Sequence, residues 1–376
     1  MELPLGAWVL AAGAVATPAG IVPDAWVVVD RDRVLDVGDG PPPERPAWTT
    51  GGLVAPGFVD AHVHGGGGAS FDGGAREAVE RVVATHLRHG TTTMVASLVT
   101  ASLDSLEASC AALADAVEAG LVAGIHLEGP WLSPQRAGAH DPSLLVPPTL
   151  EAVDRLVAAA RGHLRMVTLA PELPGALVAL PELVEAGVVV AVGHTEATYD
   201  QTREALAAGA TVGTHLFNAM PPLHHRDPGP VGALLESSAY VELVADGVHV
   251  HPSVLSLAWR EGRTALVTDA MAAAGAPDGA YELGGLAVSV EDGVARLAGT
   301  GAIAGSTGTL DAALRLAVAA AGVPLPEALA AVSSTPAAML GLADVGVVAP
   351  GAWADLVVLS DDLEVERVLR HGTWLA

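Results

Sequence analysis

The chain has 376 residues, which suits one large domain with a small accessory domain beside it. Its formal net charge is −25 and all 18 of its basic residues are arginine, so the chain has no basic surface for nucleic acid. Although mean hydropathy is +0.44, no charge-free apolar run reaches the roughly 20 residues that a membrane helix needs, so we expect no membrane partner either.

The amino-terminal segment and the cysteine content indicate the cellular compartment in which the protein works. Residues 5–17 are apolar, as in a signal peptide, but the first basic residue is Arg31, so the positive start of such a peptide is missing. Cys110 is the only cysteine, which excludes an internal disulfide and suits a reducing environment. We therefore expect a cytoplasmic protein.

Both ends of the chain are rich in short strand patterns. Residues 1–52 alternate strand-like runs with turns and end after the proline-rich linker 41–43, and residues 343–376 return to strands. We expect the two ends to pair as one small β-sandwich.

The middle of the chain, residues 53–342, alternates apolar strand-like runs with alanine-rich helical runs, which is typical of parallel strands joined by crossover helices. There are eight such units, so we predict an α/β fold closed as a (β/α)8 TIM barrel. A β-hairpin near 281–305, with its turn at Asp292-Gly293, interrupts this rhythm as an insertion. The predicted strands end at 60–62, 97–99, 126–128, 168–170, 192–194, 214–216, 246–249 and 268–270.

Six acids and histidines fall at these strand ends, where barrel enzymes place their catalytic groups. His62 and His64 are two apart on one strand, so both imidazoles point to the same side and can reach one ion. A lone His-X-His is more often structural, but the joint pattern indicates a metal centre, and such donors favour zinc or iron. The candidate ligands are His62, His64, Glu128, His194, His215 and Asp269.

The motifs around these residues resemble the amidohydrolase superfamily and, within it, the N-acetylglucosamine-6-phosphate deacetylases. The resemblance covers nearly the whole chain. The motifs are PGFVDAHVHG at 56–65, HLEGPWL at 126–132, GAHDP at 138–142, VGHT at 192–195, THLFNAM at 214–220, HHRDPG at 224–229, ADGVHV at 245–250, VTDAM at 267–271 and AGSTGTL at 304–310.

This resemblance implies one or two divalent metal ions per subunit. Glu128, His194 and His215 would hold one ion, and His62 and His64 would hold a second, bridged by Glu128. Many amidohydrolases bridge their metals with a carboxylated lysine, but this chain has no lysine, and Glu128 is the substitute.

The implied reaction is hydrolysis of the acetamide of N-acetylglucosamine-6-phosphate to glucosamine-6-phosphate and acetate. The metal would lower the pKa of the attacking water, and Asp269 would take its proton and deliver it to the departing amine. His140 would help at the developing oxyanion.

The resemblance also places substrate-binding groups. His249 would contact the sugar, and the backbone around Asn218 and Ala219 would contact the 6-phosphate together with Arg226. In relatives this arginine comes from the partner subunit, so a homodimer is implied.

Other readings stay open. The chain could be another amidohydrolase, acting on a cyclic amide or an N-acyl amino acid, or a non-catalytic metal-binding barrel that senses a sugar phosphate, although Asp269 argues against the latter. Arg226 could be a surface ion-pair partner, and His251 could compete with His249. Trp131 could wall the pocket or simply pack. We expect His126 to pack near the ligands, and four histidines to be ordinary surface residues: His86, His89, His163 and His371.

Overall fold

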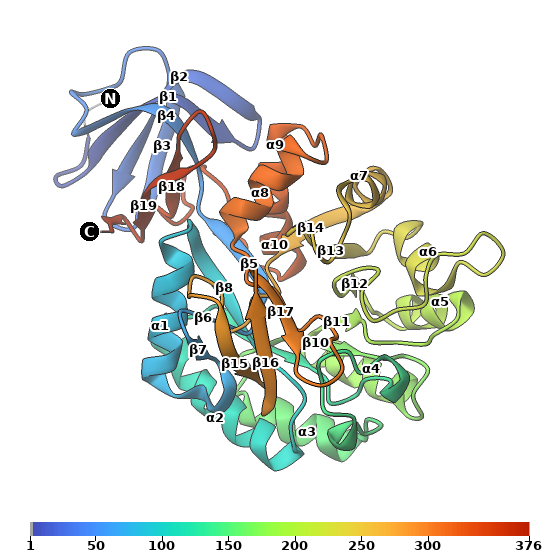
Figure 1. Ribbon diagram of the computed structural model, residues 1–376. Coiled ribbons are helices and arrows are strands. Elements are labelled where there is room, and N and C mark those ends of the chain that lie inside the picture. The colour runs from blue at the N-terminus through green and yellow to red at the C-terminus, as the bar shows by residue number, and fades with distance from the viewer. Residues whose placement is uncertain (1–2, 376) are drawn as a thin grey trace.

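The computed structural model describes residues 3–375, and its central feature is a sheet of eight parallel strands. The sheet has the order β14-β13-β12-β11-β10-β9-β8-β5, and each strand corresponds to one of the eight predicted from sequence. The predicted (β/α)8 barrel is therefore confirmed (Figure 1). The strands are β5 (Phe58–Val63), β8 (Thr91–Leu98), β9 (Gly124–Glu128), β10 (Leu164–Leu169), β11 (Val189–Val192), β12 (Val212–Gly213), β13 (Tyr240–Val244) and β14 (Arg263–Val267).

The first and last barrel strands meet through a buried acid. Thr268, just after β14, donates from its hydroxyl to Asp60 Oδ2 on β5 at 2.6 Å and from its main-chain N–H to Asp60 Oδ1 at 3.2 Å. Val63 and Ala270 form a parallel bridge beside this contact. These contacts bring the strand that carries His62 next to the segment that carries Asp269.

Helices cover the outside of the barrel (Figure 1). The hydroxyl side chains of Ser102, Thr149 and Thr198 cap the amino-terminal ends of three of them, and Thr198 forms a reciprocal capping box with Gln201. No helix within residues 3–375 has the length and hydropathy to cross a membrane. The helices are α1 (Arg76–Leu87), α2 (Leu103–Glu118), α3 (Leu150–Ala159), α4 (Ala176–Glu185), α5 (Tyr199–Ala207), α6 (Gly229–Leu235), α7 (Pro252–Glu261), α8 (Leu310–Ala319), α9 (Leu325–Ala331) and α10 (Ser334–Met339), with short 3-10 turns η1 (Asp72–Gly74), η2 (Pro134–Arg136) and η3 (Pro142–Leu144).

Side chains alternate between the two faces of each barrel strand, and this alternation separates the apolar core from the candidate site. On β9, Ile125 and Leu127 pack into the apolar layer beneath the helices, while His126 and Glu128 point to the other face, inside the barrel. At the amino-terminal end the barrel is filled by apolar side chains, where Met166 packs with Met339 of α10. The predicted metal ligands thus lie at the carboxyl-terminal ends of the strands, above this apolar layer.

The two chain ends pair with each other as expected, and the strands of the predicted β-sandwich belong to one continuous sheet of seven (Figure 1). The sheet has the order β20-β19-β18-β4-β1-β2-β3, and β4 lies between β1, to which it is parallel, and β18, to which it is antiparallel. Its strands are β1 (Trp8–Thr17), β2 (Gly20–Asp30), β3 (Arg33–Asp39), β4 (Trp48–Pro56), β18 (Leu356–Leu359), β19 (Val365–Arg370) and β20 (Thr373–Trp374).

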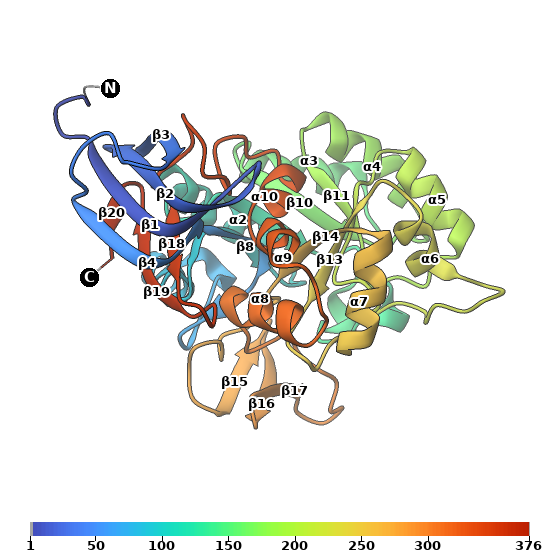
Figure 2. The ribbon, with the colours of Figure 1, turned by 90° about the horizontal axis from the view of Figure 1, so that it is seen from above.

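A separate three-stranded sheet follows β14 and projects from the barrel (Figure 2). The strands at the predicted hairpin, β16 (Leu286–Glu291) and β17 (Val294–Leu297), pair antiparallel, and β15 (Gly279–Leu283) adds a third strand on the other side of β16. Sequence reasoning did not include β15 in this unit. A two-stranded ribbon, β6 (Gly65–Gly66) and β7 (Ala69–Ser70), lies after His64.

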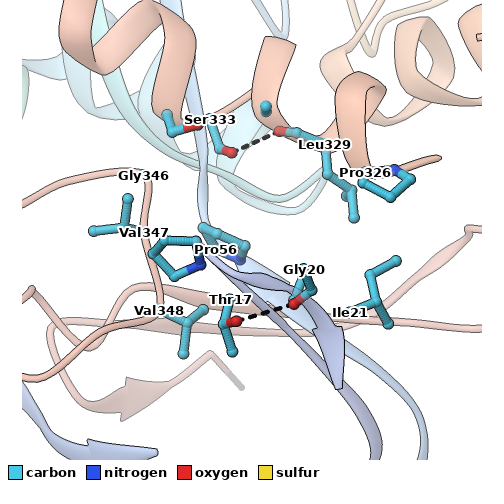
Figure 3. A pocket seen from close by; sticks show the side chains of 14 residues that line it. Thr17, Gly20, Ile21, Pro56, Pro326, Leu329, Ser333, Gly346, Val347 and Val348 are labelled. Carbon is cyan, nitrogen blue, oxygen red and sulfur yellow. Dashed lines mark hydrogen bonds between the residues drawn. The ribbon is translucent and has the colours of Figure 1, made fainter. Parts of the chain in front are cut away.

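A cavity of about 260 Å³ separates the terminal sheet from the barrel (Figure 3). Pro56, which ends β4 and is separated from β5 by a single glycine, lines it, so the cavity lies at the amino-terminal ends of the barrel strands. Two of its hydroxyls donate to main-chain carbonyls, Thr17 to Gly20 at 3.0 Å and Ser333 to Leu329 at 2.6 Å. This cavity is a packing gap between the two units, at the opposite end of the barrel from the predicted ligands.

Candidate metal centre

Two groups of ligands meet at the carboxyl-terminal end of the barrel, and Glu128 belongs to both. In the first group, the Nε2 atoms of His62 and His64 lie 3.0 Å apart. Glu128 Oε2 lies 3.2 Å from His64 Nε2 and 3.6 Å from His62 Nε2. All three side chains are buried, and His64 and Glu128 border a cavity above the centre.

The second group uses the other carboxylate oxygen. Glu128 Oε1 lies 3.0 Å from His194 Nε2 and 2.9 Å from His215 Nε2, and these two nitrogens are 3.0 Å apart. In each group the potential ligand atoms lie within 4.8 Å of one another. Glu128 therefore offers one oxygen to each group, as a bridging carboxylate does.

The donor atoms suit metal ions rather than a network of hydrogen bonds. Two imidazole nitrogens that face each other at 3.0 Å can share only one proton, and this arrangement occurs twice. Imidazole and carboxylate donors that converge in this way match the ligand preference of zinc or iron. The residues present thus fit one or two divalent cations.

The electrostatics of the centre also favour positive charge. Burial disfavours a charged imidazole, but the carboxylates of Glu128 and Glu242 outweigh it and raise the pKa of His62 well above its ordinary value. Burial acts in the same way on His64, yet hydrogen bonds with Asp269 and Glu128 raise its pKa to about 9. A divalent cation would supply the positive charge that protons otherwise provide here.

The backbone that presents three of these residues is left-handed. His194, His215 and Asp269 have φ values of 47°, 28° and 49°, a region that residues other than glycine rarely adopt. Each lies two positions beyond the last residue of its strand, where β11, β12 and β14 end. Such backbone costs on the order of 1–3 kcal/mol per residue and persists mainly at functional sites.

Asp269 lies beside the first group and remains ionised. Its Oδ1 is 3.4 Å from His64 Nε2 and 3.6 Å from His62 Nε2. Burial alone would raise its pKa, but the hydrogen bond from His64 prevails and lowers the pKa of Asp269 to about 2. The carboxylate is therefore available to accept a proton.

His140 is held as a neutral donor. The main-chain N–H of Thr100 donates to His140 Nδ1 at 3.2 Å, which leaves the proton of the neutral ring on Nε2. That nitrogen lies 3.3 Å from Glu128 Oε2, and His140 borders the cavity. Burial lowers the pKa of His140 to about 4, so the ring stays neutral near pH 7.

A cavity of about 350 Å³ opens above these groups. His249 borders it and pairs with Asp246 through Nδ1 at 2.7 Å; burial opposes its charged form, but this hydrogen bond raises the pKa of His249. The structure thus brings all but one of the residues predicted from sequence to this cavity or directly beneath it. The residues that line it are His64, Val99, Glu128, Gln135, Arg136, Gly138, Ala139, His140, His194, His215, Asn218, Ala219, His249, Asp269, Leu283, Ala302, Ile303 and Gly305.

Arg226 is the predicted residue that lies elsewhere. It sits in the exposed turn 224–227, closed by a bridge between His224 and Asp227, and its Nη1 lies 2.7 Å from His225 Nε2. The turn belongs to the yellow loop that projects from the molecule just before α6 (Figure 2). Within one chain, Arg226 does not reach the cavity.

Two residues that sequence reasoning missed support the ligands. Glu242 is buried on β13, and its Oε2 accepts a hydrogen bond from His62 Nδ1 at 3.1 Å. A signal was available, since Glu242 is the single acid in an otherwise apolar strand. Arg136 borders the cavity, and its carbonyl accepts a hydrogen bond from His194 Nδ1 at 2.7 Å. A main-chain contact of this kind leaves no signature in a sequence.

The expectation for His86 was wrong. It is fully buried under the glycine-rich segment after His64, and its Nε2 lies 2.8 Å from the carbonyl of Gly65, to which it donates. Burial lowers the pKa of His86 to about 4. Its position follows from helical spacing, because it continues the buried face of α1 that includes Val79 and Val82.

The expected packing role of His126 fits the structure. Its Nδ1 lies 2.9 Å from Ser97 Oγ and its Nε2 lies 2.9 Å from Thr168 Oγ1, while its ring meets that of His62 edge-on. Trp131 is fully buried in the layer between helices and barrel, so it packs rather than walls the cavity.

Comparison with known proteins identifies the family. The model of the amidohydrolase family matches residues 53–375. The chain belongs to the amidohydrolase family. Among solved structures, this amidohydrolase is similar to N-acetyl-D-glucosamine-6-phosphate deacetylase of Mycobacterium smegmatis, with 50% identity, 98% of this chain and 99% of that chain covered, and a TM-score of 0.96. That structure is a complex of an aspartate-to-alanine variant with N-acetyl-D-glucosamine-6-phosphate.

Curated relatives carry closely related names. The amidohydrolase is 41% identical to N-acetylgalactosamine-6-phosphate deacetylase of Escherichia coli O157:H7, with 85% of this chain and 87% of that protein covered. It is 36% identical to N-acetylglucosamine-6-phosphate deacetylase of Lysinibacillus sphaericus, with 86% of this chain and 85% of that protein covered. These relatives confirm the resemblance that the motifs indicated.

Proposed function

We propose that this amidohydrolase removes the acetyl group of N-acetylglucosamine-6-phosphate, giving glucosamine-6-phosphate and acetate. The observation that carries the proposal is the meeting, in one cavity, of both ligand groups with Asp269 and His140. The likeness to a structure that holds this substrate, at 50% identity, supports the choice of sugar.

We assign the metal to two positions that share Glu128, one with His62 and His64 and the other with His194 and His215. Zinc or iron suits these donors. When bound, the metal supplies Lewis-acid polarisation of the acetyl carbonyl and lowers the pKa of water.

The proton transfers fall to Asp269. As an ionised carboxylate at the floor of the cavity, it accepts a proton from the attacking water and returns it to the amine as the C–N bond breaks. Proton return matters because an amine leaves far more readily once protonated. The aspartate-to-alanine variant in which the M. smegmatis enzyme was seen with its substrate is consistent with an essential aspartate.

His140 is assigned to the developing oxyanion. His140 borders the cavity, and its neutral ring keeps a proton on Nε2 that it can donate to the carbonyl oxygen as negative charge grows there. We assign His249, braced by Asp246, to the hydroxyl groups of the sugar.

The phosphate subsite is assigned to the turn at Asn218 and Ala219. Ala219 has a φ of 49°, and the N–H of Asn218 already donates to the carbonyl of His215 at 3.0 Å, so the N–H of Ala219 is the better main-chain donor to phosphate. Arg136 is the arginine of the same chain that borders the cavity among the described residues. Arg226 would come from a partner subunit, so we propose a homodimer.

A second candidate substrate is the C4 epimer, N-acetylgalactosamine-6-phosphate, because the relative at 41% identity is named for it. The first test is hydrolysis by zinc- or iron-loaded protein of both phosphorylated epimers and of unphosphorylated N-acetylglucosamine. We expect fast turnover of a phosphorylated sugar that a chelator abolishes. Equal turnover with and without phosphate would refute the phosphate subsite, and no turnover of any of the three would refute the proposed function. We place the reaction in the cytoplasm, which the lone buried thiol of Cys110 suits.

A further inference from the structure

Glu242 is a fully buried acid directly beneath the metal centre. One oxygen, Oε2, accepts the Nδ1–H of His62 at 3.1 Å and lies 3.4 Å from the main-chain N–H of His215. The other oxygen, Oε1, has no hydrogen-bond partner among the described residues. A buried carboxyl that leaves an oxygen unpaired destabilises the fold, so a role in stability alone does not account for it.

The contact with His62 decides which nitrogen of that ring is free. Because Nδ1 carries the proton that Glu242 accepts, Nε2 presents its lone pair towards His64 and Glu128. A carboxylate acceptor also makes the ring a stronger donor to a metal than a neutral acceptor does.

The two ligand groups differ in this support. In the second group, His194 is oriented by a neutral acceptor, the carbonyl of Arg136 at 2.7 Å. The Nδ1 atoms of His64 and His215 have no partner among the described residues. Each group thus contains one oriented imidazole, and an acid orients it only in the first group.

We propose that Glu242 is the positioning residue that gives the His62–His64 group its affinity for metal, and that it leaves the affinity of the His194–His215 group unchanged. This inference rests on the metal centre proposed above. Removing such a supporting acid typically costs 10- to 100-fold in metal affinity. Oε2 makes both the contact with His62 and the longer contact with the main chain of His215, and glutamine at position 242 keeps an oxygen for both. The variant therefore removes the negative charge of the acceptor that faces His62 Nδ1.

The test measures zinc binding to metal-free protein, by equilibrium dialysis with elemental analysis and by competition with a coloured chelator. Wild type is expected to bind two ions. Glu242→Gln is expected to bind zinc with unchanged affinity at one position and with 10- to 100-fold weaker affinity at the other. The matched control is Asp355→Asn, because Asp355 is also a buried acid with one unpartnered oxygen but lies beside the terminal sheet. It should leave both affinities unchanged.

Double variants assign the affected position. With His194→Gln, the remaining ion lies in the His62–His64 group, and adding Glu242→Gln should weaken it. With His64→Gln, adding Glu242→Gln should change nothing. Nitrogen chemical shifts of the histidine rings in zinc-loaded wild type give a readout that needs no variant at position 242, and they should show His62 protonated at Nδ1 and bound through Nε2.

The outcomes separate this inference from the proposed function. Three results would each overturn the role of Glu242 alone. They are two unchanged zinc affinities in Glu242→Gln, a weakened affinity at the His194–His215 group instead, and zinc bound through Nδ1 of His62. A wild type whose His62–His64 group never fills would do the same. A wild type that binds no zinc and no iron would overturn the metal centre itself, and the role of Glu242 with it.

Discussion

The buried His86 makes stability depend on pH in a way that can be worked out. Its pKa is about 4 in the folded chain, against 6.5 as the ordinary value. Between these values the unfolded chain holds a proton on His86 that the folded chain does not, so acid favours unfolding. The contribution is complete above pH 6.5 and is lost as the pH falls towards 4.

The size of the effect follows from the two pKa values. For a shift from 6.5 to about 4, linkage gives a loss of about 2 kcal/mol in the free energy of unfolding between pH 8 and pH 5. The limit at lower pH is about 3.4 kcal/mol. Because the side chain is fully buried, solvent screening does not reduce this figure substantially.

The perturbation is His86→Gln, whose amide can still donate to the carbonyl of Gly65 but does not titrate. Urea unfolding of metal-free wild type and variant is measured at pH 8, 7, 6 and 5. Titration of the ligand histidines is common to both proteins and cancels in the difference. We expect wild type to lose about 2 kcal/mol more than the variant over this range. Parallel stability curves for the two proteins would refute the reasoning.

Three further predictions concern activity. Asp269→Asn should lower kcat by about 10²- to 10⁴-fold while the number of bound metal ions, measured by elemental analysis, stays the same; unchanged turnover would remove Asp269 from proton transfer. Arg136→Gln should raise KM about tenfold for the phosphorylated sugar and leave the unphosphorylated sugar unaffected, whereas Arg203→Gln, which removes an exposed partner of Glu236, should change neither. Finally, mixing Arg226→Gln with Asp269→Asn protein, with subunit exchange, should restore activity, because a hybrid dimer contains one complete site; activity that stays at the sum of the two separate proteins would show that Arg226 does not act across subunits.

Sequence patterns predicted the barrel well because each unit repeats the same physical pattern. Even β12, with only two residues in strand conformation, was located, because His215 follows it in the expected place. The candidate ligands come together for a related reason: the carboxyl ends of parallel strands bring distant positions such as Glu128 and His194 to one rim.

What the sequence did not predict depends on contacts that have no local pattern. The main-chain carbonyl of Arg136 orients His194. Any residue at position 136 with the same backbone conformation could present such a carbonyl. Glu242 acts across the barrel on His62, and a single acid within a strand does not say which partner it has. His86 was misjudged because its hydrophilic side chain was weighed more heavily than its place on the buried face of α1.

The position of β4 has a consequence for the order in which the protein matures. One edge of β4 pairs with β1, which the ribosome has already made, but the other edge pairs with β18, which is synthesised only after the whole barrel. After Pro56 at the end of β4, a single glycine leads into β5, which carries His62 and is followed directly by His64, the two histidines that we propose to bind metal. During translation, β4, which immediately precedes this first barrel strand, therefore presents an open sheet edge that is prone to pairing with other chains. That edge is covered only when residues 356–359 emerge, so the stretch that fixes His62 and His64 is among the last parts of the nascent chain to be secured.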